Sequence, residues 1–253
     1  HCHLYAEEFD EDRAEVVARA LEAGADKILL PNIDANTVGP MLAVCDEWPE
    51  LCHPMLGLHP TELPPNPTPL LDQMERMLMV EGNPFIAIGE VGVDLYWDAS
   101  RREEQMEVLR RQAEWSIRFQ LPLVIHMRSA HDELLEVLSP LKDQLPGGIF
   151  HCFGGSAKEA EDLLAFERFY LGIGGVVTFK KSTLPAVLET TVPLSRIVLE
   201  TDAPYLAPTP YRGKRNEPTH IPLVLHKVAE VYGVAPEEVS HITCDNARRL
   251  FKL

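Results

Sequence analysis

Short apolar runs rich in β-branched residues alternate with stretches of helical period along the whole chain. Counting the opening HCHL, there are eight such runs, at residues 1–4, 27–33, 53–59, 85–94, 121–128, 147–153, 170–179 and 196–202. Between them lie stretches such as 11–24 and 101–120, in which apolar residues recur every three or four positions. Runs that are apolar throughout are typical of parallel strands that are buried on both faces beneath helices.

Eight strand–helix units in 253 residues predict an α/β fold, the (β/α)8 or TIM barrel. An open parallel sheet with a peripheral hairpin is the alternative architecture. No linker, low-complexity tract or internal repeat interrupts the pattern, so we expect residues 1–253 to form a single domain. The proline-rich residues 60–69 are expected to be an ordered loop after the third strand.

The charge of the chain limits the partners that it can bind. With a formal net charge of -16, the protein repels phosphates on average, which argues against binding along an extended duplex. A small active site can still accept a phosphodiester where metal ions and a few local cations outweigh the global field, because salt screens distant charges beyond about 8 Å.

The cysteine pattern indicates the compartment. Five cysteines form no C-x-x-C pair and are odd in number, so we expect reduced thiols in a cytoplasmic protein. No apolar run reaches the 18 or so residues that a membrane span needs, so no membrane association is expected. The oligomeric state is left open by the sequence, with a monomer as one possibility.

Polar residues of unusual type fall at the carboxyl ends of the predicted strands. They are His1 and His3 on the first strand, His59 on the third, Glu90 on the fourth, His126 on the fifth, His151 on the sixth and Asp202 on the eighth. In a barrel these ends meet at the face where the loops build the active site. A single buried histidine is more often a structural residue, but the repetition at six strand ends favours a functional site.

The residue types in this set indicate metal chemistry. Four imidazoles (His1, His3, His126, His151) with two carboxylates exceed the needs of one tetrahedral ion and suggest two divalent ions, with Glu90 as the bridge. Imidazole ligands favour zinc, manganese, nickel or iron over magnesium, although availability can override that preference. Asp202 is expected to orient the attacking water and accept its proton.

Longer motifs give the chain a family resemblance. It resembles the TatD-type metal-dependent deoxyribonucleases of the amidohydrolase superfamily, in HCHL at 1–4, GLHP at 57–60, GEVGVDLY at 89–96, HMRSA at 126–130, HCFGG at 151–155 and ETDAPYLAPTPYRGKRNEP at 200–218. The resemblance covers essentially the whole chain. It differs at Tyr5, where an acidic residue is common, and at Met127, where serine is common.

The resemblance implies a TIM barrel with two metal ions and hydrolysis of DNA ends, preferably single-stranded, in the 3′-to-5′ direction. One ion would be held by His1, His3, Glu90 and Asp202, and the other by Glu90, His126 and His151. Glu90 and Asp202 would carry the chemistry.

Cations near these residues are candidates for phosphate binding. Arg212, Lys214 and Arg215 lie within four residues of one another after the eighth strand, and we expect Arg212 and Arg215, together with His59 and Arg128, to contact substrate. Tyr96 and Trp97 follow the glutamate motif and could stack on a base, although such aromatic residues are as often loop packing. Glu200 is expected either to support the ligands or to lie in the barrel core.

Two other functions are compatible with such a site. An amidohydrolase acting on a C–N, ester or lactone bond of a small metabolite would use a similar H-x-H site, but a neutral amide does not need three nearby cations. A non-catalytic barrel predicts an incomplete ligand set, whereas every expected ligand is present here.

Overall fold

The computed structural model describes all 253 residues. The chain forms two compact units. The first unit comprises His1–Leu29 and Phe150–Leu253, and the second comprises Leu30–Ile149. Strands β1 (Ile28–Leu30) and β5 (Gly148–Phe150) contain the points where the chain passes from one unit to the other. The expectation of a single domain stays a prediction.

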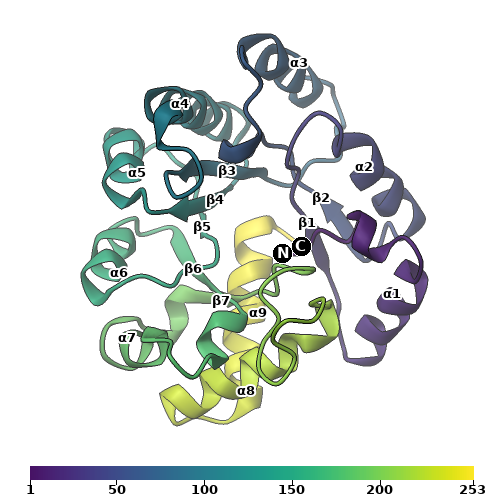
Figure 1. Cartoon of the computed structure of the whole chain (residues 1–253), viewed down its shortest axis with the longest axis vertical. Helices are drawn as coiled ribbons and strands as arrows, with labels where there is room; N and C mark the ends of the chain where they lie inside the picture. The colour runs from purple at the N-terminus through teal and green to yellow at the C-terminus, as the bar shows by residue number, and fades with distance from the viewer. The chain divides into compact units, whose positions relative to one another are not determined.

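The second unit is built around two long parallel strands. Its elements are α2 (Val38–Glu47), β2 (Cys52–Pro54), α3 (Thr68–Leu78), β3 (Ile88–Asp94), α4 (Arg102–Phe119), β4 (Leu123–Arg128) and α5 (His131–Leu138). Strand β3 pairs with β4 in parallel register, from Ile88 opposite Leu123 to Asp94 opposite Arg128. All seven residues of β3 are buried, and α4 and α5 lie on the same side of β3 and β4 (Figure 1). The continuous apolar run at 85–94 thus becomes a strand with no solvent-facing side.

The first unit holds the remaining helices and the parallel pair β6–β7. Its elements are α1 (Arg13–Glu22), α6 (Ala157–Leu164), β6 (Phe169–Ile173), α7 (Leu184–Thr191), β7 (Ile197–Leu199), α8 (Ile221–Tyr232) and α9 (Pro236–Phe251). Leu171, Gly172 and Ile173 of β6 lie opposite Ile197, Val198 and Leu199 of β7. The buried Asn246 of α9 donates to the carbonyls of Ser195 and Ile197, which fixes the helix against β7.

Several strands are shorter than the apolar runs that predicted them. The run at 196–202 yields only Ile197–Leu199, and the opening HCHL yields one parallel bridge between Cys2 and Ala203 in place of the expected first strand. Residues with left-handed backbone, Ser129, Cys152 and Asp202, follow β4, β5 and β7 at φ values of 54°, 49° and 57°. An extended ladder cannot continue through such a residue, and β4 ends directly before Ser129. Strands β5 and β7 already end at Phe150 and Leu199, before Cys152 and Asp202 are reached.

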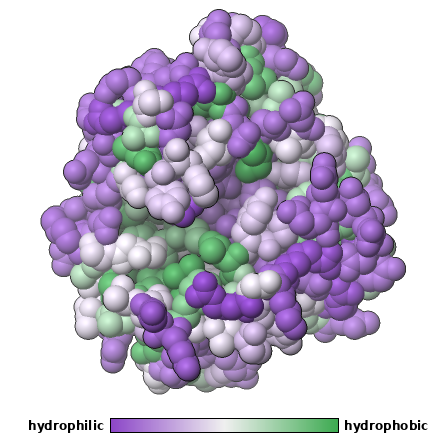
Figure 2. Space-filling view, viewed as in Figure 1, coloured by the Kyte–Doolittle hydropathy of each residue, from purple (hydrophilic) through white to green (hydrophobic).

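Hydrophilic residues cover most of the face shown in Figure 2, with smaller hydrophobic areas between them. No helix combines the length and the apolar character that crossing a bilayer requires. The first unit also contains a cavity of about 320 Å³ beside α8 and α9, with His1 and Glu200 among its lining residues.

Candidate metal centre

Three histidines of the first unit surround one carboxylate oxygen. Asp202 Oδ1 lies 3.6 Å from His1 Nε2, 3.3 Å from His3 Nε2 and 3.7 Å from His151 Nε2. The left-handed backbone of Asp202 is held by its own N–H, which donates to the His1 carbonyl, and by the Tyr205 N–H, which donates to the Asp202 carbonyl. A non-glycine residue in this conformation is uncommon, and here the surrounding hydrogen bonds fix it with its side chain among the imidazoles.

The imidazole rings themselves are tightly arranged. The rings of His1 and His151 are stacked at a centroid distance of 3.9 Å, and the His3 ring lies 5.2 Å from that of His1. The Tyr5 hydroxyl lies 3.0 Å from His3 Nδ1, which leaves Nε2 directed at Asp202. Tyr5 therefore orients a ligand in the way that partners of metal-binding histidines do.

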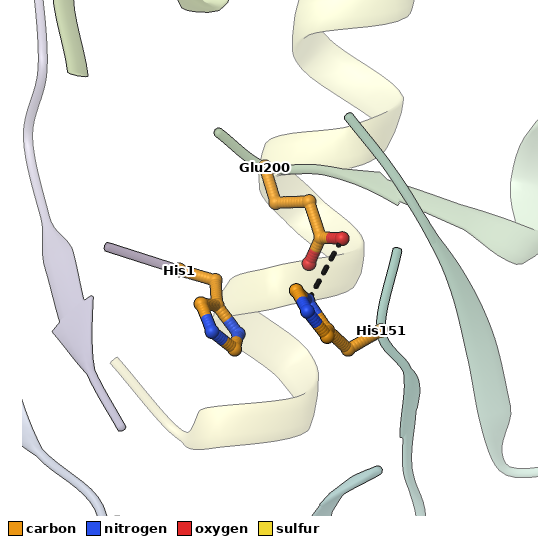
Figure 3. A group of neighbouring side chains, drawn as sticks. All are labelled: His1, His151 and Glu200. Carbon is orange, nitrogen blue, oxygen red and sulfur yellow. Dashed lines mark ion pairs between the residues drawn. The ribbon is translucent and has the colours of Figure 1, made fainter. Parts of the chain in front are cut away.

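Glu200 faces His151 from the end of β7. The two side chains approach to 3.0 Å between Glu200 Oε1 and His151 Nδ1, beside His1 (Figure 3). The carboxylate also accepts the backbone N–H of Cys152, and Glu200 is only 4% exposed. Gly172 provides the space, because a Cβ atom there would lie 2.7 Å from Glu200 Oε2. Glu200, which the sequence left between two roles, thus contacts the ligand set directly.

The second unit contains a cluster around Glu90. Glu90 Oε1 lies 3.1 Å from His126 Nδ1 and 3.4 Å from His59 Nε2. The rings of His59 and His126 are 4.5 Å apart, and Glu90 is 3% exposed. His59, expected to contact phosphate, lies in position to act as a ligand. We call His59, Glu90, Asp94 and His126 the second-unit cluster, and His1, His3, His151, Glu200 and Asp202 the first-unit cluster.

Asp94 is a member of the second-unit cluster that the sequence analysis missed. Its Oδ2 lies 2.9 Å from His126 Nε2, and its side chain is almost completely buried. Burial alone would raise the pKa of Asp94, but hydrogen bonds from His126 and from the backbone N–H groups of Trp97 and Tyr96 hold that pKa below its ordinary value. The signal was available, since Asp94 lies four residues after Glu90 and therefore on the same face of the strand.

Both clusters fit divalent ions by the chemistry and spacing of their donors. Ligand atoms of His1, His151 and Glu200 lie within 4.8 Å of one another, and so do those of His151, Cys152 and Asp202 and those of His59, Glu90 and His126. Neutral imidazoles with buried carboxylates form the donor set that zinc and similar ions take. The expected meeting of all these residues at one face stays a prediction, since they divide between the two units.

The predicted phosphate-binding arginines have different surroundings. Arg128 is exposed at the end of β4, with its guanidinium carbon 3.9 Å from the centre of the Tyr96 ring. The corresponding atom of Arg212 lies 3.7 Å from the centre of the Phe179 ring. Arg215 instead forms two hydrogen bonds of 2.7 Å with Asp12 and one of 2.9 Å with Glu217, and these partners raise its pKa. Its guanidinium is thus already engaged within the protein.

Comparison with known proteins shows the family to which the chain belongs. The family model described as TatD related DNase matches residues 1–252. The chain belongs to the TatD family. It is 35% identical over 258 residues to the uncharacterized metal-dependent hydrolase YabD of Bacillus subtilis, covering 100% of this chain and 98% of that protein. It is 32% identical to the 3′-5′ ssDNA/RNA exonuclease TatD of Pectobacterium parmentieri, covering 99% and 97%.

A solved TatD structure supports the fold. YjjV of Escherichia coli, a TatD homologue, superposes with a TM-score of 0.92 at 30% identity and covers 100% of this chain and 96% of its own. The predicted α/β fold class, a TIM barrel, is thereby confirmed. The TatD relatives also confirm that the chain is a metal-dependent hydrolase.

Proposed function

We propose that this TatD protein hydrolyses phosphodiester bonds at the ends of single-stranded DNA, removing nucleotides from the 3′ end. The observation that carries the proposal is the convergence of His1, His3 and His151 on one carboxylate oxygen of Asp202. Such an arrangement suits the activation of a water molecule for attack on an ester. Similarity to relatives named as 3′-5′ ssDNA/RNA exonucleases supports the choice of nucleic acid as substrate.

Two divalent ions are proposed as cofactors, with zinc, manganese, magnesium and nickel as candidates. The first-unit cluster would hold one ion and the second-unit cluster the other. When bound, such ions supply Lewis-acid activation of water and neutralise phosphate charge. Asp202 would orient the attacking water and accept its proton, because its Oδ1 already faces the imidazoles that fix the site.

Local cations support a phosphodiester over a neutral amide. Arg128 stands at the end of β4, opposite Asp94 in the β3–β4 ladder and in the strand that also carries His126. Arg212 projects from the loop that follows Asp202. In a protein of net charge -16, these guanidinium groups provide the attraction that a phosphate needs at close range. We therefore propose that Arg128, Arg212 and His59 bind the substrate. Arg215, which is bonded to Asp12 and Glu217, would instead hold its own loop in place.

The compartment proposed is the cytoplasm. No disulfide joins any of the five cysteines, and burial raises the pKa of Cys45 and Cys52 to about 12. Cysteines that form no disulfide suit a protein kept in a reducing environment.

The test is metal-dependent release of nucleotides from 3′-labelled and 5′-labelled single-stranded DNA, with a matching RNA oligonucleotide. Metal-free protein should be inactive, and magnesium, manganese or zinc should restore activity. Asp202→Asn and Glu90→Ala should each lower kcat by at least about 100-fold, since each removes a group from a cluster. Glu189→Gln, which changes an exposed carboxylate of α7, should retain wild-type activity.

The same assays distinguish the proposed function from the alternative, an amidohydrolase. If no metal supports cleavage of DNA or RNA while the protein binds divalent ions, the phosphodiesterase proposal fails. Hydrolysis of small esters, lactones or amides by the same metal-loaded protein would then identify an amidohydrolase. Full nuclease activity in an Asp202→Asn variant that still binds metal would remove Asp202 from the mechanism.

A further inference from the structure

Two large aromatic side chains of the second unit are displayed to solvent beside a cation. Trp97 is 68% exposed and Tyr96 is 59% exposed, and Trp97 has the largest exposed fraction of any large apolar side chain in the protein. Their rings meet edge to face at a centroid distance of 5.1 Å. The Arg128 guanidinium carbon lies 3.9 Å from the Tyr96 ring centre and 5.3 Å from that of Trp97. We call these three residues the aromatic platform.

The backbone beneath the platform is held by several hydrogen bonds. Asp94 Oδ1 accepts the N–H groups of Tyr96 and Trp97 at 3.0 and 3.2 Å. The buried Gln105 of α4 donates to the carbonyls of Asp94 and Asp98, and so holds the turn at both of its ends. The Leu95 N–H donates to the Arg128 carbonyl at 2.9 Å. If the aromatic side chains served only to pack the loop, they would be buried, whereas here the backbone is fixed and the rings face water.

The same carboxylate joins the platform to the second-unit cluster. Asp94 binds the turn through Oδ1 and lies 2.9 Å from His126 Nε2 through Oδ2. A group that stacks on Trp97 is therefore held at a fixed position relative to His126. Pre-organisation of this kind lowers the entropy lost on binding, because neither the turn nor the histidine must become ordered.

We propose that Trp97, with Tyr96 and Arg128, is a stacking site for a nucleobase near the scissile end of a single-stranded substrate. The inference rests on the proposed function, to which it adds a contact with the base. An aromatic face accepts any base, since every base has a π-face, and the guanidinium attracts the adjoining phosphate. A duplex end does not offer an unstacked base, so the platform also selects single strands.

Oligonucleotide binding by variants tests the platform. The probe is a labelled single-stranded dodecathymidylate, bound to chelator-treated protein so that it is not cleaved, and cleaved by the metal-loaded protein in a parallel assay. Trp97→Ala should weaken binding and raise KM by about fivefold or more, with Trp97→Phe recovering most of the loss. Arg128→Ala should weaken binding in a more salt-dependent way. Val80→Ala, which shortens another exposed apolar side chain of this unit, is the matched control.

An oligonucleotide that lacks its 3′-terminal base, or the base before it, tests the identity of the contact. If one of these bases stacks on Trp97, removing the base and removing the indole eliminate the same contact. The affinity should then fall little more when both are removed than when either is removed alone. If the fold-losses in affinity from base removal and from Trp97→Ala simply multiply at both base positions, the indole contacts something other than those bases. That result would overturn the proposal.

The possible results separate the platform from the proposed function. Binding and cleavage by Trp97→Ala within twofold of wild type would overturn the platform and leave the function standing. Binding that depends on Trp97, in a protein that cleaves no nucleic acid with any metal, would support the platform and overturn the function. A wild-type protein that neither binds nor cleaves the oligonucleotide would overturn both.

Discussion

At the scale of single residues, Asp94 connects more parts of the site than its place in the sequence indicates. It lies 2.9 Å from His126 and accepts two backbone N–H groups of the following turn. Partners of metal-binding histidines fix the ring and its tautomer, and their loss typically lowers metal affinity or activity by about 10- to 100-fold. Asp94 is therefore a positioning residue for His126.

Replacing Asp94 by asparagine tests this role. The amide oxygen can still accept the turn's N–H groups, but the negative charge beside His126 is lost. We expect metal affinity and kcat to fall by about 10- to 100-fold, with the melting temperature changed far less. Metal titration followed by calorimetry measures the affinity, and Asp98→Asn, which alters an exposed carboxylate of the same turn, is the control. Unchanged metal affinity in Asp94→Asn would show that the residue serves the turn alone.

Residues of the site differ in how far the sequence predicts them. Glu90, His126 and Asp202 were predicted because each lies in or at the end of a recognisable apolar run, and ligands gather where parallel strands end. Their role as ligands stays a prediction. Arg215 could not be assigned in the same way, since its partner Asp12 lies 203 residues away in the chain. Cationic loops look alike in sequence whether they face a substrate or a carboxylate of the same protein, and only the fold distinguishes the two.

At the scale of elements, the parallel pair β3–β4 depends on glycine for its close approach. Gly92 of β3 has φ of 149°, and a Cβ atom there would lie 1.9 Å from the carbonyl oxygen of His126. That oxygen belongs to backbone, so neither strand can give way without breaking the ladder that carries Glu90, Asp94 and His126. The sequence GEVGVD predicts a strand, but it does not reveal how closely the backbones of β3 and β4 approach each other.

Gly92→Ala should therefore unfold or strongly destabilise the protein. Overpacking in cores costs about 1–3 kcal/mol or more, and contact with backbone places this substitution at the upper end or beyond. Gly39→Ala is the matched control, because Gly39 lies in α2 with nothing within 4 Å of its added Cβ, and it should be neutral or raise stability by up to about 1 kcal/mol. Denaturant unfolding of both variants measures the difference. Equal stability of Gly92→Ala and wild type would show that the two strands separate easily.

At the scale of the whole molecule, the alternation of runs was enough to predict the fold class, which the whole-chain likeness to YjjV confirms. Strand boundaries were less accessible, because β5 ends at Phe150 and β7 at Leu199, within apolar runs that continue to Phe153 and Asp202. Beyond the end of β7, the left-handed Asp202 lies among His1, His3 and His151. A molecule of net charge -16 that buries Glu90 and Glu200 needs counter-charge at both places.

Metal removal should consequently lower the stability of the folded protein. An ion that binds only the folded state at 100 times its Kd contributes about 2.7 kcal/mol, which corresponds to several degrees in Tm for a protein of this size. Chelator should lower the Tm by about 5–10 °C if one ion is lost, and readded zinc or manganese should restore it. Asp202→Asn should abolish the part of the shift that comes from the first-unit cluster, and Glu90→Ala the part from the second. If each variant still shows the full wild-type shift in Tm on metal removal, the ions bind elsewhere. Loss of the entire Tm shift in either variant would mean that the two clusters bind metal cooperatively.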